Sequence, residues 1–236
     1  MKKIISNIFK LIFIITLALV FFIIFNGYIL YKDAIKEKSI SDRVNEIKNS
    51  EHFSSMNDVT DDYINAVIAI EDHRFFYHFG VDILTTLRAA ATDIISKDIV
   101  AGGSSITQQV AKNLCFSQEK VFSRKAAELF VVYELEKNYS KEEIFEIYIN
   151  SIYFGNGYYN IYDASQGYYN KLPSELTLYE STILAGVPNA PSAYAPTINL
   201  KLAEKRQIAV LNAMVKYGYL SQDEANKIIN SQKSKV

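Results

Sequence analysis

The stretch LIFIITLALVFFIIFNGYIL, from Leu11 to Leu30, separates a short N-terminal tail from a much longer C-terminal body. Its apolar run is interrupted only by a threonine and an asparagine, and it contains no charge. As an α-helix rising about 1.5 Å per residue, the segment extended by one residue would be roughly 30 Å long, which matches the hydrocarbon core of a bilayer. The sequence therefore predicts a transmembrane anchor over residues 11–31, preceded by a short cytoplasmic tail of residues 1–10.

A cleavable signal peptide is the competing interpretation of this segment. Its apolar region would be shorter, and a cleavage site of small residues should follow it, whereas residues 27–36 (GYILYKDAIK) offer no convincing site. The lysines on the two sides of the segment nearly balance, so the positive-inside rule gives little preference. The short tail and large body favour a cytoplasmic N-terminus and a C-terminal domain outside the cell membrane.

The body of the chain has the composition of a folded domain. The chain has 236 residues, of which 49% are hydrophobic and 22% are charged, with a formal net charge of −1. Disorder is not expected from this balance, and neither is nucleic acid as a partner. Cys115 is the only cysteine, which excludes an intrachain disulfide, and the histidines lack metal-ligand spacing.

Helical patterns dominate the body, and alternating strand patterns are almost absent. Residues 32–50 are polar and predict a helical stalk or linker, while residues 51–236 predict one mainly α domain. The proline-rich segment VPNAPSAYAPT, residues 187–197, predicts an extended loop. Capping boxes, in which Ser or Thr precedes Gln or Glu by three positions, predict several helix starts. They are formed by Ser105 and Gln108, Ser140 and Glu143, Thr177 and Glu180, and Ser221 and Glu224.

Glu71 lies at the inner edge of an apolar helix face. A carboxylate there must be paired, hydrogen-bonded or directed into a cleft, because an unsatisfied buried charge is very unfavourable. Partial desolvation would raise its pKa and make it a better base near neutral pH. An ion pair with Arg74 or Arg88 is the structural alternative.

Glu128 repeats this pattern on a second predicted helix, where it shares a stripe with apolar residues three, four and seven positions later. Arg124 precedes it by one turn, so a helical salt bridge is the structural alternative. Two such carboxylates also suggest sugar chemistry, in which an acid–base pair flanks an anomeric carbon.

The segment AGGSSITQQVAKNL, residues 101–114, lies between the two glutamates. Its glycines are followed by a predicted helix start, and exposed amides at a helix start suit an anion such as phosphate. A local group of cations would suit a pyrophosphate; a solvated basic face is the alternative. These cations are Lys112, Lys120, Arg124 and Lys125.

Four ordered motifs resemble those of the peptidoglycan glycosyltransferase family, which comprises monofunctional biosynthetic enzymes and the transglycosylase domain of class A penicillin-binding proteins. The motifs are EDHRFFYHFG (residues 71–80), GGSSITQQ (102–109), RKAAE (124–128) and KEEIFEIYIN (141–150). The resemblance implies a lysozyme-like helical fold. It also implies polymerisation of lipid II, an undecaprenyl-pyrophosphate-linked disaccharide pentapeptide, into β-1,4-linked glycan strands by inverting transfer with release of undecaprenyl pyrophosphate.

The resemblance also implies roles for individual residues. Glu71 would be the general base that deprotonates the acceptor hydroxyl. Glu128 would assist at the donor pyrophosphate, directly or by positioning cations or a divalent Mg or Mn ion; no tightly bound cofactor is expected. We expect the two carboxylates to open onto one cleft, roughly 10 Å apart. The other predicted substrate-binding residues are Ser104, Gln108, Gln109, Lys112, Lys120, Arg124, Lys125 and Asn150.

Two other functions remain as alternatives. A lytic transglycosylase or muramidase would cut glycan and need an acid but no pyrophosphate site. A non-catalytic scaffold of cell-wall synthesis would not need both glutamates. Besides lipid II and the growing glycan strand, the expected partners are membrane lipid and other cell-wall synthesis proteins.

Overall fold

A computed structural model describes residues 2–88, 103–116 and 122–233. Within these ranges the chain is mainly α-helical and has no β-strand, which confirms the predicted class. The longer helices are α1 (Lys2–Ala34), α2 (Ile40–Lys48), α3 (Asp61–Glu71), α5 (Ile106–Cys115), α6 (Phe122–Asn138), α7 (Lys141–Ile149), α8 (Ile161–Tyr169), α9 (Leu178–Gly186), α11 (Leu200–Lys216) and α12 (Gln222–Lys233). The shorter ones are η1 (Met56–Asp58), η2 (Phe75–Tyr77), η3 (Pro173–Glu175), η4 (Val187–Asn189) and α10 (Pro191–Tyr194).

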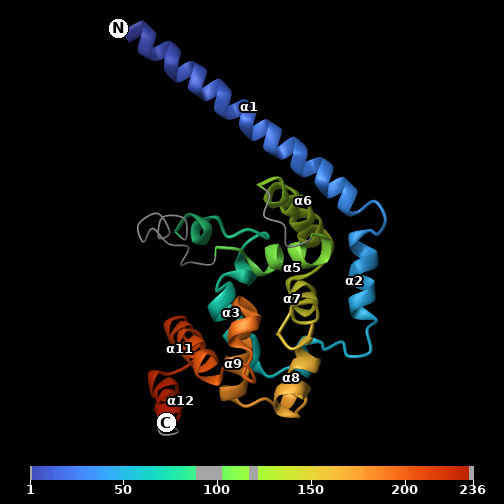
Figure 1. The fold of residues 1–236 in the computed structure, drawn as a ribbon, viewed down its shortest axis with the longest axis vertical. Helices are drawn as coiled ribbons and strands as arrows, with labels where there is room; N and C mark the ends of the chain where they lie inside the picture. The colour runs from blue at the N-terminus through green and yellow to red at the C-terminus, as the bar shows by residue number, and fades with distance from the viewer. Residues whose placement is uncertain (1, 89–102, 117–121, 234–236) are drawn as a thin grey trace.

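Helix α1 projects away from the rest of the molecule (Figure 1). Over Lys3–Ala34 its most apolar window has a mean hydropathy of 3.0 and is 0% buried. By length and composition it is a candidate membrane span, as predicted, and it begins well before residue 11. Its apolar side chains are exposed along this surface, and hydration of such a surface in water is unfavourable.

The C-terminal part of α1 packs against α6. The ring of Tyr28 lies 5.4 Å from that of Phe130, centroid to centroid, and the Tyr31 hydroxyl donates to Glu134 Oε2 at 2.8 Å. A Cβ atom at Gly27 would lie 2.5 Å from the Cβ of Ala126, so only glycine allows the helices to approach this closely.

This contact predicts that Gly27→Leu will separate α1 from α6. Overpacking of this kind costs roughly 1–3 kcal/mol, so we expect a lower thermal midpoint for the detergent-solubilised chain. Ala18→Leu is the matched control, because Ala18 is exposed on the same helix. Equal midpoints for the two variants in a melting experiment would contradict this interface.

Helix α2 belongs to the folded body. Ile40 and Val44 are buried in the main apolar core. Arg43 donates to the carbonyl of Ala34 at 2.9 Å and to that of Leu114 at 3.0 Å. The segment expected as a stalk or linker over residues 32–50 therefore contributes to the core and joins the end of α1 to α5.

Two groups of helices form the rest of the body. Helices α3, α9 and α11 pack on one another, and α5 packs against α6 and α7. All four predicted capping boxes are present, and each places a hydroxyl and a carboxylate or amide on the backbone of a helix start. The boxes fix where these helices begin, and the packing then sets how their ends face one another.

The expected extended loop at residues 187–197 is wrong. This segment forms η4 and α10 instead. Pro188 and Pro191 stand in the first turns of these short helices, where the fixed φ of proline favours a helical start and its missing N–H removes no hydrogen bond. Helical turns here bring the segment against the end of α9.

Candidate active site

A polar cleft of about 440 Å³ opens where the ends of several helices meet. It draws residues from α3, the start of α5, α6, η4 and α11, which are far apart in the sequence. Its lining residues are Ile70, Glu71, Ser104, Gln108, Gln109, Lys112, Lys125, Pro188, Asn189 and Arg206.

Glu71, the last residue of α3, provides the carboxylate of this cleft. Its Oε2 accepts a hydrogen bond from Gln109 Nε2 at 2.7 Å, and its Oε1 lies 3.8 Å from an Arg206 guanidinium nitrogen. The side chain is only 13% exposed. Burial raises the pKa of Glu71 above its ordinary value, although Gln109 and Arg206 act in the opposite direction. The expected raised pKa of this carboxyl is therefore confirmed, and its cause is desolvation.

Asp72 ties the end of α3 to the beginning of α5. Both of its carboxylate oxygens lie 2.9 Å from His78 Nε2, and Oδ2 accepts the backbone N–H of Ile106 at 3.2 Å. This bond uses one of the amides at the start of α5, where the sequence suggested a phosphate. The backbone N–H of Ile106 is therefore not available to a phosphate, in contrast to the sequence-based prediction, because Asp72 already accepts its hydrogen bond. The same link holds Glu71 beside Gln109.

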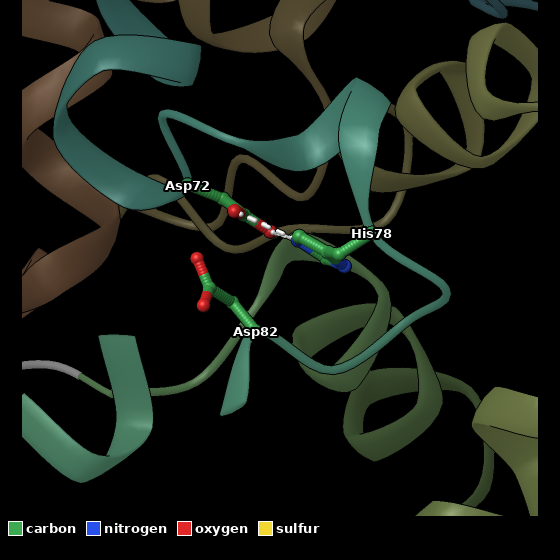
Figure 2. A group of neighbouring side chains, drawn as sticks. All are labelled: Asp72, His78 and Asp82. Carbon is green, nitrogen blue, oxygen red and sulfur yellow. Dashed lines mark hydrogen bonds and ion pairs between the residues drawn. The ribbon is translucent and has the colours of Figure 1, made fainter. Parts of the chain in front are cut away.

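Asp82 lies close to this pair, with side-chain ligand atoms of the three residues within 4.8 Å of one another (Figure 2). Arg74 Nε donates to Asp82 at 2.8 Å, so Arg74 is not the ion-pair partner of Glu71. Burial alone would raise the pKa of Asp82, but bonds from Arg74 and Thr85 outweigh it and hold that pKa well below its usual range. Because the Arg74 guanidinium is already bound to Asp82, binding of a second cation is disfavoured. The cluster of Asp72, His78 and Asp82 therefore has a structural role.

Glu128 is completely buried, with 0% of its side chain exposed. Its Oε1 lies 3.1 Å from Arg124 Nε, and its Oε2 lies 2.8 Å from Lys125 Nζ, which confirms the helical ion pair and adds a second cation. Glu128 does not line the cleft, in contrast to our expectation for the two carboxylates. The physical reason is that Lys125 lies over it and reaches Ser104 Oγ at 3.2 Å.

This arrangement bears on the Mg or Mn ion suggested near Glu128. Both carboxylate oxygens face cationic side chains, which is unfavourable for binding a further cation. A metal ion with the substrate pyrophosphate stays a prediction of the sequence, and Glu128 is a poor ligand for it in this geometry.

The remaining predicted residues fall into three groups. Ser104, Gln108 and Lys112 line the cleft, and Gln108 also closes the capping box of α5. Lys120 lies outside the described residues. Asn150 binds the backbone of Ser54 and Glu146 through three hydrogen bonds and so braces these two segments. Its role toward substrate stays a prediction of the sequence.

Arg206 is the charged residue of the cleft lining that sequence reasoning missed. It lies on α11, outside the four motifs, and nothing in its local pattern distinguishes it from neighbouring basic residues. A Cβ at Gly186, the last residue of α9, would lie 2.9 Å from Arg206 Cγ, so glycine leaves room for the arginine stem. The local feature related to the position of Arg206 is therefore Gly186, which lies on another helix and does not by itself indicate an arginine.

Comparisons with known proteins show the family of this chain. The chain belongs to the transglycosylase family, whose profile matches residues 37–215. It is 42% identical over 180 residues to penicillin-binding protein 1A of Neisseria gonorrhoeae, and 41% identical over 171 residues to penicillin-binding protein 1F of Bacillus subtilis. These alignments cover 76% and 72% of this chain but 23% and 24% of the relatives, so the chain spans about a quarter of their length.

A solved structure, penicillin-binding protein 1A from Haemophilus influenzae, is also similar. The match has a TM-score of 0.45 and 24% sequence identity, and it covers 75% of this chain and 17% of the other.

Proposed function

We propose that this chain is a membrane-bound peptidoglycan glycosyltransferase that polymerises lipid II and releases undecaprenyl pyrophosphate. The observation that carries the proposal is the cleft in which Glu71, a largely buried carboxylate with a raised pKa, faces the cations Lys112, Lys125 and Arg206. A base and a set of phosphate-binding cations in one cleft are what glycosyl transfer from a pyrophosphate donor needs.

In the proposed reaction, Glu71 accepts the proton of the acceptor 4-hydroxyl. The freed oxygen attacks the anomeric carbon of the donor from the side opposite the pyrophosphate. A new β-1,4 bond forms as the bond between that carbon and the pyrophosphate oxygen breaks, and the configuration inverts. Gln109 donates to Glu71 and so holds the carboxylate in one orientation.

The cations stabilise the negative charge that develops on the leaving pyrophosphate. Lys112 has no acidic partner among the described residues, so its charge is available to a ligand. Lys125 is 51% exposed and bound to Glu128. Glu128 thus acts on donor binding indirectly: its ion pairs hold Lys125 and Arg124 in position, and its own carboxylate does not contact the substrate.

The lytic alternative does not require these cations, because a glycan substrate carries no pyrophosphate. Incubating the chain with lipid II in detergent and resolving the products separates the candidate functions. We expect glycan polymer. Cleavage of preformed glycan without polymerisation would favour the lytic enzyme, and no reaction with either substrate would favour the scaffold.

The body also has an exposed apolar surface suited to contact lipid, with the C-terminal domain outside the cell membrane. In this proposal the surface keeps the cleft near the lipid-linked substrate. Its large apolar side chains are between 47% and 66% exposed. They are Phe79, Ile83, Leu84, Leu87, Leu129 and Tyr133.

The absence of tryptophan from the chain allows a direct test of this surface. We expect Leu84→Trp in proteoliposomes to show blue-shifted fluorescence that brominated lipids quench. Tyr159→Trp is the control, because Tyr159 is 62% exposed and lies outside this surface. A spectrum for Leu84→Trp that matches the control and is not quenched would contradict the lipid contact.

A further inference from the structure

Two tyrosines on different helices are buried with unpartnered hydroxyl groups. Tyr63 on α3 is 0% exposed and Tyr148 on α7 is 1% exposed. Neither hydroxyl has a hydrogen-bond partner among the described residues, and the same holds for Nε of Arg206. Buried polar groups are nearly always hydrogen-bonded, so three such atoms require an explanation.

All three groups are linked to the carboxylate of Glu71, Arg206 by an ion pair and the two tyrosines by electrostatic interaction. Arg206 lies 3.8 Å from its Oε1, and Tyr63 precedes it by two helical turns. Burial raises the pKa of both tyrosines, and the charge of Glu71 raises each pKa further. Tyr63 raises the pKa of Tyr148, and Arg206 lowers it. The side chains of Glu71, Tyr63, Tyr148 and Arg206 therefore form one electrostatic cluster. Both tyrosines are fully buried and absent from the cleft lining, whereas Glu71 and Arg206 line the cleft.

Phenylalanine would fill the same space without burying hydroxyls, so the two tyrosine oxygens need a polar function here. At 3.8 Å the Arg206 guanidinium forms an ion pair with Oε1 of Glu71 but lies beyond hydrogen-bond distance, and its Nε has no partner among the described residues. Internal water commonly joins buried polar groups that cannot reach one another directly.

We propose that Tyr63, Tyr148 and the Nε of Arg206 form a buried polar pocket that donates hydrogen bonds to Glu71 through internal water. The tyrosines are positioning residues: they stabilise the ionised carboxylate from behind while its other side faces substrate. Burial raises the pKa of Glu71 and so favours its protonated form, and a protonated carboxyl cannot act as the base. The catalytic consequence rests on the function proposed above.

The other charged groups near Glu71 do not provide this support. Asp72, which directly follows α3, is hydrogen-bonded to His78 and raises the pKa of Glu71. Lys112 and Lys125 line the cleft, where the proposed function assigns them to the substrate pyrophosphate. On α9, which packs against α3, the titratable residues bind elsewhere: Tyr179 donates to Glu204, and Glu180 accepts from Lys171.

The test measures the Glu71 pKa directly in the full-length chain in detergent. The ¹³C resonance of its carboxyl carbon is followed against pH and assigned by its absence in Glu71→Gln. Removal of a donor to the ionised form raises a carboxyl pKa, and one hydrogen bond corresponds to a shift of about half a unit to one unit. We expect that increase in both Tyr63→Phe and Tyr148→Phe, with the acid limb of the polymerisation profile moving to higher pH by the same amount.

Tyr169→Phe is the matched control. Its hydroxyl is also buried and has no hydrogen-bond partner among the described residues. The charged and polar groups that raise its pKa are Tyr179, Glu180 and Tyr168, and Glu71 is not among them. This variant should leave the Glu71 pKa unchanged. An unchanged Glu71 pKa in both cluster variants, particularly with a higher melting temperature, would overturn the proposal. The NMR readout does not depend on activity, so wild-type failure to polymerise lipid II would refute the proposed function separately.

Discussion

Glu71→Gln should lower polymerisation of lipid II by at least ~100-fold, the usual scale of a lost general base. Glutamine preserves the shape of the side chain but has no basic oxygen of comparable strength. Because the cations of the cleft are untouched, binding of lipid II should persist. The measurement is turnover together with equilibrium binding, and near-normal turnover would refute the assignment of Glu71 as the base.

The same variant should not lose stability. A carboxyl whose pKa is raised in the folded state contributes stability that is fully present below its unfolded pKa and is lost as pH rises through its folded pKa. At neutral pH the buried charge of Glu71 is therefore unfavourable, and Glu71→Gln should melt at the wild-type temperature or above. Glu142→Gln, at an exposed site on α7, controls for the change in net charge and should retain full activity.

Lys112→Ala should weaken donor use by roughly 10- to 100-fold, because a hydrogen bond to a charged group is worth about 1.5–3 kcal/mol. Since Lys112 has no acidic partner in the described part of the chain, its loss should leave the melting temperature nearly unchanged. Lys205→Ala is the control: Lys205 is exposed on α11, beside Arg206, and does not line the cleft.

Arg124→Ala should behave differently from Lys112→Ala. The sequence predicts both as cations that bind the substrate pyrophosphate, and loss of such a ligand would affect activity more than folding. In the structure Arg124 is an ion-pair partner of the fully buried Glu128. Removing one partner of a buried pair is strongly destabilising, so we expect this variant to lose both activity and thermal stability. Equal melting temperatures for the Arg124 and Lys112 variants would contradict the ion-pair geometry.

The sequence by itself determined the features that depend on short-range spacing. A long apolar run is sufficient for α1, and a hydroxyl three positions before Gln or Glu is sufficient for each capping box, because these interactions lie within one helix or its first turn. The position of Glu71 on an apolar helix face predicted a desolvated carboxylate in the same way. Family resemblance then indicated which of these residues would meet in a site.

Only the tertiary structure decided which groups surround Glu71. Helix packing places Arg206 of α11 beside the carboxylate at the end of α3 and brings Tyr148 of α7 within its electrostatic influence. It also buries Glu128 beneath Lys125 and uses Asp72 to cap α5. The physical reason is that contacts between helices depend on their relative positions, and the periodicity of a single helix specifies which face is apolar but not which partner covers it.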